Sequence, residues 1–217
     1  MPGDIYITAS SLINQQGIFK NERAVFKNNN TSLPEFLIAA YRDSGISYPK
    51  FYKMDNLAKL GWLAAEVLLK DSFETGKYQP EDVGIIFSNN NSSLDADLKY
   101  FESTKTIASP ALFVYTLPNI VIGEICIKHK FKGENAFFIF DAFDAGFIEK
   151  YVTNLINSNI LQACICGWVE SVGEEYLAAL FLVEKIAVAP TGPVATDSAA
   201  MVFTKENLNK IYYLRDG

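Results

Sequence analysis

The chain has 217 residues, a length that fits one large domain or two small ones, and its 49% apolar content is enough for a core. Its formal net charge of −6 disfavours a nucleic-acid partner, which would select a basic surface. The start lacks the pattern of a signal peptide, and the longest apolar run, Leu177–Val183, is too short to span a membrane. We therefore expect a cytoplasmic protein with no membrane span.

The first half of the chain predicts a short strand and two helices. Residues 5–9 alternate as a strand does, and a polar loop is expected from there to Asn30. Ser32 and Glu35 have the spacing of a capping box that opens a helix ending at Gly45. The clearest helix is expected over residues 55–73, with Asp55 as its N-cap.

The second half alternates strands with helices. Apolar strands are predicted at 83–87, 136–141 and 160–169, a last strand at 199–204, and helices at 94–106, within 117–130 and at 144–158. Periodicity leaves residues 174–186 open between helix and strand, and residues 189–193 form a turn-rich break. This order predicts a single α/β domain over residues 1–217, with a mixed, mostly parallel five-stranded sheet and helices on both faces.

The three cysteines give no sign of a disulfide framework or a metal site. Cys126 stands alone, and Cys164 and Cys166 lie on one face of a predicted strand, where we expect ordinary buried side chains. A metal site would need more ligands, and His129 is the only histidine in the chain. His129 is expected at a helix C-terminus, where a cation is favourable. We therefore expect no metal and no cofactor.

The segment 136–147 predicts a strand, a tight turn and a helix. Enzymes place a reactive side chain at the helix N-terminus of such an elbow. Ala142 and Gly146 keep the turn small, but Phe143 stands where a nucleophile would be, and a phenyl ring cannot attack a substrate. Asp144 is expected to cap the following helix rather than to act as an acid.

Several segments resemble one family, the β-ketoacyl synthases, which have the thiolase-like fold. These segments are Lys53-Met54-Asp55, the strand at 82–86, Ser109-Pro110, residues 116–119, residues 123–127, Lys132-Gly133, residues 163–170 and residues 197–203. Their order and spacing cover nearly the whole chain. The resemblance implies the N-terminal half of a thiolase-like fold.

The sequence departs from the family at two places. The Thr-Ala-Cys-x-Ser-Gly of the family is similar to residues 141–146 here, but Phe143 replaces the cysteine. The similarity also ends with the chain, so that the family's C-terminal half, with its two histidines, has no counterpart. The resemblance therefore implies a chain-length factor, which is a subunit without a nucleophile that pairs with a competent synthase. Short proteins of this kind accompany bacterial synthases of aryl-polyene-type pigments, and this chain resembles them.

The expected partner surface combines the elbow strand with the helix after it. Residues 144–158 are apolar around much of a helix, which predicts burial on more than one side. The interface is expected to include Phe137, Phe138, Ile139, Phe140, Phe147 and Tyr151. The partner would be a full-length ketosynthase subunit in a heterodimer, or a second copy in a homodimer, with acyl carrier protein reached indirectly.

Two other functions stay open at this point. The chain could be an active acyltransferase that uses Cys164, Cys166 or Ser109, although the sequence shows no base for them. It could also be a self-associating module that binds acyl chains without an enzyme partner. The role of Phe143 is open as well, because its ring could fill a dead site or form part of a tunnel wall.

Overall fold

The computed structural model describes residues 4–27, 31–186 and 200–213. A single sheet has the strand order β3-β2-β1-β7-β6-β4-β5, and β8 pairs with β1 off this path. The strands are β1 (Asp4–Asn14), β2 (Gly17–Lys20), β3 (Arg23–Lys27), β4 (Val83–Asn89), β5 (Asn135–Ile139), β6 (Ala163–Val172), β7 (Glu175–Ile186) and β8 (Met201–Val202).

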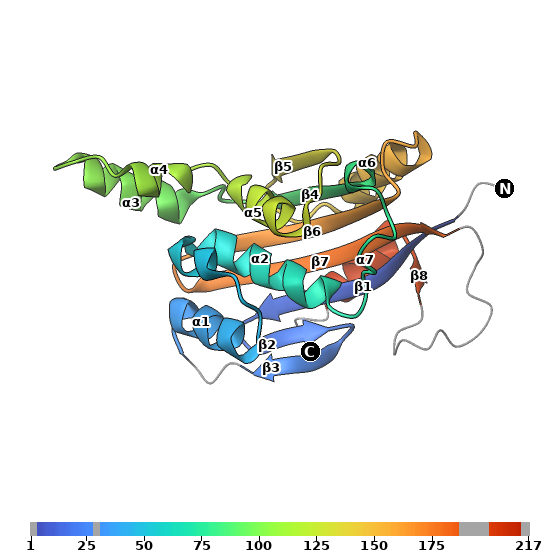
Figure 1. Ribbon diagram of the computed structural model, residues 1–217, viewed down its shortest axis with the longest axis horizontal. Coiled ribbons are helices and arrows are strands. Elements are labelled where there is room, and N and C mark those ends of the chain that lie inside the picture. Colours follow the sequence, from blue (N-terminus) through green and yellow to red (C-terminus); the bar gives the residue numbers. More distant parts are fainter. Residues whose placement is uncertain (1–3, 28–30, 187–199, 214–217) are drawn as a thin grey trace.

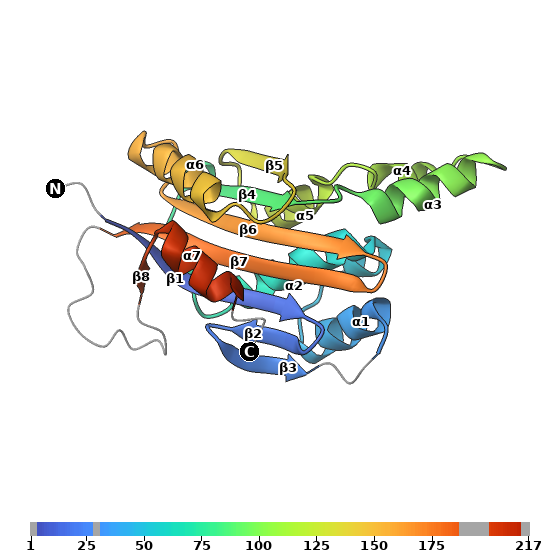
Figure 2. The same ribbon diagram turned by 180° about the vertical axis from the view of Figure 1, so that it is seen from behind.

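Helices cover both faces of the sheet (Figures 1 and 2). The α-helices are α1 (Leu33–Asp43), α2 (Asn56–Leu69), α3 (Leu94–Thr104), α4 (Pro110–Val114), α5 (Ile120–His129), α6 (Ala145–Asn157) and α7 (Lys205–Tyr212), and the short 3-10 helices are η1 (Pro49–Lys53) and η2 (Pro80–Asp82). Helices α1, α2 and α5 lie on one face, and α6 and α7 lie on the other. Among the described residues, no helix is both long enough and apolar enough to cross a membrane.

Each face of the sheet has its own hydrophobic core. The first core is built around α2, whose Leu60, Trp62 and Leu63 are fully buried. The second core lies under α6 and α7 and includes Ile148 and Leu208. Because β4, β6 and β7 contribute side chains to both cores, these central strands are almost entirely buried, as their continuous apolar sequences predict.

The predicted α/β class, with a mixed sheet and helices on both faces, is confirmed. The strand number and the prevailing direction were predicted wrongly. In the part of the chain that the structure describes, the sheet has eight strands, and only the β4–β5 and β4–β6 pairs are parallel. The expected polar loop after residue 9 instead continues β1 and forms the antiparallel strands β2 and β3. Residues 174–186, which periodicity left open, are resolved as strand β7, antiparallel to β6.

Helix ends agree well with the sequence signals. The Glu35 carboxylate accepts hydrogen bonds from the Ser32 backbone N–H and hydroxyl, and Gly45 has a left-handed φ of +70°. The Asp55 carboxylate accepts from the Ala58 N–H at 2.9 Å, so it is the predicted N-cap of α2. The predicted break at residues 189–193 lies outside the described residues, as does the start of the predicted strand at 199–204, of which β8 is the described part.

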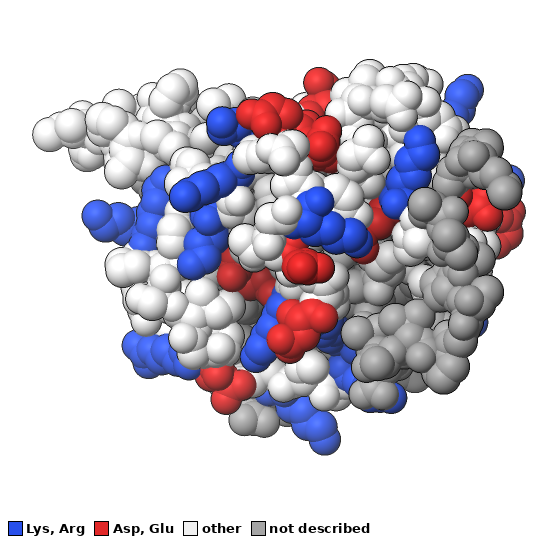
Figure 3. Space-filling model, turned by 45° about the vertical axis from the view of Figure 1, so that its right-hand side comes forward, with Lys and Arg blue, Asp and Glu red and all other residues white. Residues whose placement is uncertain are grey.

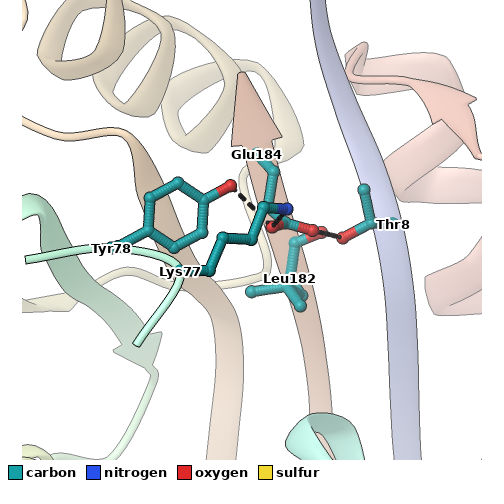
Figure 4. A network of polar contacts seen from close by, with 5 residues as sticks. All are labelled: Thr8, Lys77, Tyr78, Leu182 and Glu184. Carbon is teal, nitrogen blue, oxygen red and sulfur yellow. Dashed lines mark hydrogen bonds and ion pairs between the residues drawn. The ribbon is translucent and has the colours of Figure 1, made fainter. Parts of the chain in front are cut away.

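A buried carboxylate joins the outer end of β7 to its neighbours (Figure 4). Glu184, only 3% exposed, accepts hydrogen bonds from Lys77 Nζ and Tyr78 Oη, both at 2.7 Å, and from the Thr8 hydroxyl on β1. Burial, together with the hydrogen bond to Glu184, raises the pKa of Tyr78 to about 12. A buried charge is tolerated when its hydrogen bonds are satisfied in this way, so the network anchors the loop after α2 to the sheet.

The pKa of Asp55 makes the stability of the first core depend on pH. Burial raises this pKa to about 6, against the partial compensation of the Ala58 N–H. The folded state therefore binds a proton more tightly than the unfolded chain between about pH 4 and 6, and stability falls as pH rises through that window. Asp55→Asn keeps a capping oxygen but cannot ionise. We expect the wild type to lose about 2 kcal/mol more unfolding free energy than Asp55→Asn between about pH 4 and 7.

Urea denaturation of both proteins across this pH range measures the difference directly. All other titrating groups are shared, so the difference between the two curves isolates Asp55. Parallel pH profiles for the two proteins would show that the Asp55 carboxyl is not perturbed by burial.

Candidate functional site at the elbow before helix α6

The elbow lies at the carboxyl ends of the parallel strands β4, β5 and β6. Ligand sites in α/β sheets usually lie at these strand ends. Two hydrogen bonds connect the elbow to the end of β4: the Phe140 N–H donates to the Asn89 carbonyl at 2.9 Å, and Asn90 Nδ2 donates to the Asp141 carbonyl at 2.7 Å. The Glu170 carboxylate of β6 accepts from the Asn90 N–H at 2.7 Å. All three strands therefore fix the turn.

Phe143, at the position expected for a nucleophile, is packed among aromatic rings. Only 8% of the residue is exposed. Its ring stacks on Tyr212 of α7 with 4.4 Å between centroids, and it lies 6.2 Å from Phe181 and 6.3 Å from Trp168. The side chain thus belongs to the second core, under α7, and fills the space behind the turn. This packing is compatible with the filler role, and both the filler role and the tunnel role of Phe143 stay predictions.

The residues next to Phe143 form the turn and the N-cap of helix α6. Asp144 is exposed, and its carboxylate accepts from the Phe147 N–H at 2.8 Å, which confirms it as the N-cap of α6. A Cβ atom at Gly146 would meet Asp144 Oδ1 at 3.4 Å and Lys205 Cδ at 4.0 Å, both ordinary contacts, so sterics do not require glycine there. Ala142 is exposed at the tip of the turn. The Phe147 N–H in the first turn of α6 is therefore already bound by the Asp144 carboxylate.

The alternative nucleophiles are not arranged for chemistry. Cys164 and Cys166 are fully buried in the second core, and burial raises the pKa of Cys166 well above its usual range. The Ser109 hydroxyl accepts from the Leu112 N–H at 3.3 Å and caps α4. His129 lies on the opposite face of the sheet from Phe143, where its Nε2 contacts Glu66 and its ring stacks on Phe131. Within the described ranges no three His, Cys, Asp or Glu side chains are grouped as metal ligands would be.

The expected interface residues lie at one edge of the sheet, because among the described strands β5 pairs with β4 alone. Phe138, Phe140, Phe147 and Tyr151 form a partly exposed ring cluster between β5 and α6, in which neighbouring centroids are 4.8–5.8 Å apart. Ile139, between Phe138 and Phe140 in the sequence, is 48% exposed. Phe137 faces the other side and packs against the first core. The β5 edge, defined here as β5 plus this ring cluster, is thus an apolar edge.

Sequence reasoning found the elbow but missed helix α7 and the ring of Tyr212. The spacing of Leu208, Ile211 and Tyr212 at i, i+3 and i+4 is the signal of an amphipathic helix that would have found it. Asn90 was also missed, since it lies in a polar loop that seemed to have no structural role. Its contact with Asp141 spans 51 positions in the chain and becomes visible only in three dimensions.

Neither protein-family profiles nor curated protein sequences match this chain. Solved structures do match at the level of the fold. The chain aligns with "The ishigamide ketosynthase/chain length factor" at a TM-score of 0.61 and 17% identity, over 87% of this chain and 64% of that one. It aligns with "Ketosynthase (ApeO) in Complex with its Chain Length Factor (ApeC) from Xenorhabdus doucetiae" at a TM-score of 0.57 and 13% identity, over 99% of this chain and 92% of that one.

A third match is a type II polyketide synthase complex, "AntDE:AntF", in which an acyl-carrier protein is bound to its ketosynthase; the TM-score is 0.59 and the identity 15%, over 85% of this chain and 63% of that one. The chain therefore spans less than two thirds of the length of the ishigamide and AntDE chains. Together these matches show that the chain has the thiolase-like fold of ketosynthases and chain length factors.

The contact between Phe143 and Tyr212 can be measured with a double-mutant cycle. We expect Phe143→Leu and Tyr212→Leu each to lower the free energy of unfolding, because each removes a stacked ring from the second core. The double variant should be more stable than the sum of the two losses predicts, with a coupling of about 0.5–1.5 kcal/mol. Chemical denaturation gives the three differences. Strictly additive losses would show that the two rings do not interact in solution.

Proposed function

We propose that this protein is a non-catalytic, ketosynthase-like subunit of the chain-length-factor type. It pairs with an active ketosynthase in bacterial fatty-acid or polyketide biosynthesis, in the cytoplasm, and its resemblance favours synthases of aryl-polyene-type pigments. The observation that carries this proposal is the presence of Phe143 at the position where a nucleophile is expected. A buried, stacked phenyl ring occupies the elbow on which the related fold places its nucleophile.

The geometry of the elbow opposes thiolate chemistry in a second way. A catalytic thiolate at a helix N-terminus depends on the free backbone N–H groups and the positive end of the helix dipole. In this chain the carboxylate of Asp144 already occupies the first turn of α6 by accepting from Phe147. A negative charge at this place would raise the energy of a neighbouring thiolate. The site therefore lacks both the reactive group and its stabilising environment.

The β5 edge supports the partner part of the proposal. An apolar strand at the edge of a sheet, with partly exposed rings beside it, is a liability for an isolated protein and is normally covered. A ketosynthase of the same fold carries an equivalent strand, so two such subunits can pair edge to edge around an approximate two-fold axis. The complex of ApeO with ApeC pairs two proteins of these classes, and a chain of that complex is matched over 92% of its length. Acyl carrier protein would then act through the synthase.

The isolated chain should not form an acyl-enzyme. We expect no covalent adduct and no ketoacyl product after incubation with acyl and malonyl thioesters, because the thiols of Cys164 and Cys166 are buried and Ser109 is a helix cap. Intact-protein mass spectrometry measures this. A stoichiometric adduct on any residue would instead favour an active acyltransferase.

Phe143→Cys provides a strict control for the same experiment. The new thiol would stand at the elbow but would lack a base, since the one histidine of the chain lies across the sheet. We expect this variant to remain inactive in condensation, because a nucleophile without its partners supplies little catalysis. Condensing activity in Phe143→Cys would mean that the rest of a catalytic site is intact.

Association with the synthase should depend on the β5 edge. Ile139→Asp places a charge on a residue that is 48% exposed, so we expect little change in stability but at least about a tenfold weaker affinity for the synthase. Val25→Asp is the matched control, because Val25 is 51% exposed on β3 at the opposite edge. Calorimetry with a synthase encoded in the same gene neighbourhood measures both. Equal affinities for the two variants would contradict this interface, and copurified lipid without any synthase binding would favour an acyl-chain binding module.

A further inference from the structure

The α3–α4 arm, residues 94–117, extends away from the sheet on the side where β5 lies (Figures 1 and 2). The two helices of the arm pack on each other, with 5.3 Å between the ring centroids of Tyr100 and Phe113. Its base is held by two hydrogen bonds, from the Ser93 hydroxyl to the Thr116 carbonyl at 2.6 Å and from the Gly173 N–H to Asp95 Oδ2 at 2.9 Å. The arm is thus an ordered helical hairpin with a fixed base.

This arm exposes far more apolar surface than its size warrants. It carries seven of the fourteen large hydrophobic residues that are exposed in the described chain, namely Leu94, Leu98, Phe101, Ile107, Phe113, Val114 and Leu117. Phe101 is 65% exposed and Ile107 is 85% exposed, whereas only Ala96 is buried in α3 and no residue is buried in α4. Figure 3 shows the arm projecting at the upper left, almost without charged side chains on the face in view. Such a surface marks an interface.

We propose that the arm is a second docking element for the same ketosynthase subunit that covers the β5 edge. This inference rests on the proposed function and extends it to a separate surface. The two surfaces are continuous, because Asn90, three residues before Ser93 at the base of the arm, donates to the carbonyl of Asp141 just after β5. A subunit bound along β5 therefore extends over the base of the arm.

The area of the interface favours the same occupant. A stable pair of subunits buries about 800 Å² on each partner, and obligate pairs bury more and are more apolar. β5 has only five residues, about 17 Å of strand, and its ring cluster is already partly covered by α6. The arm adds apolar area that the body of its own chain does not reach. Its aromatic and aliphatic side chains fit an apolar groove on the partner rather than a charged one.

The double substitution Phe101→Ser and Ile107→Ser tests the arm. Both side chains point away from the core, so we expect an unchanged melting temperature and circular dichroism spectrum, with an affinity for the coexpressed and purified synthase that is at least about tenfold weaker. Val25→Ser, which removes an equally exposed apolar side chain at the far edge of the sheet, should leave the affinity unchanged. Isothermal calorimetry gives the dissociation constants.

The remaining outcomes separate this inference from the proposed function. If Ile139→Asp weakens binding and the arm variant does not, the arm has no docking role while the partner proposal stands. If the wild type binds no synthase of its gene neighbourhood, both are overturned. If the arm variant loses only self-association, or only cosedimentation with phosphatidylglycerol vesicles, the arm serves a second copy or a lipid surface and the inference is wrong.

Discussion

The packing of Phe143 against Tyr212 is the contact that determines what this fold can do. It joins the elbow after β5 to helix α7, more than sixty residues further along the chain, and it brings Trp168 and Phe181 into the same ring cluster. Through this cluster the turn becomes part of the second core. The residue at the elbow position therefore contributes to the packing of the second core.

The α2 face of the sheet and the β5 side of the molecule differ in how much apolar surface they expose. On the face of α2 the core is closed by fully buried aromatic and aliphatic side chains, and the buried carboxylate of Glu184 accepts from three donors. On the side of β5 the rings of Phe138 and Tyr151 are left partly exposed, and the α3–α4 arm extends beyond them. Apolar groups are therefore exposed where a second subunit of the same fold would dock. The proposed function follows from this asymmetry together with the substituted elbow.

The sequence predicted the parts whose signals are local. Caps at Asp55 and Asp144, the buried thiols of residues 164 and 166, and the strand–turn–helix around Phe143 are all decided by neighbouring residues, and all are found in the structure. The strand number and direction were not predictable in the same way. Residues 10–27 are rich in polar side chains, and they form strands because β1 pairs with β7 along nearly its whole length. Tertiary pairing there outweighs composition. The helix that carries Tyr212 has a periodic signal that was overlooked, but its stacking on Phe143 has none, because the two rings come from segments far apart in the chain.

Hydrogen exchange of the backbone amides, with and without a bound ketosynthase, tests the central claim most directly. Within the described residues β5 is the last strand of the sheet and pairs with β4 on one side. Backbone amides of such an edge strand exchange more readily than those of central strands until another chain covers them. The account predicts that synthase binding slows exchange in β5 and in the first turns of α6, while β3 at the opposite edge exchanges as before. Protection that appears at β3 and leaves β5 unchanged would show that the apolar edge beside the substituted elbow is not where this protein meets its partner.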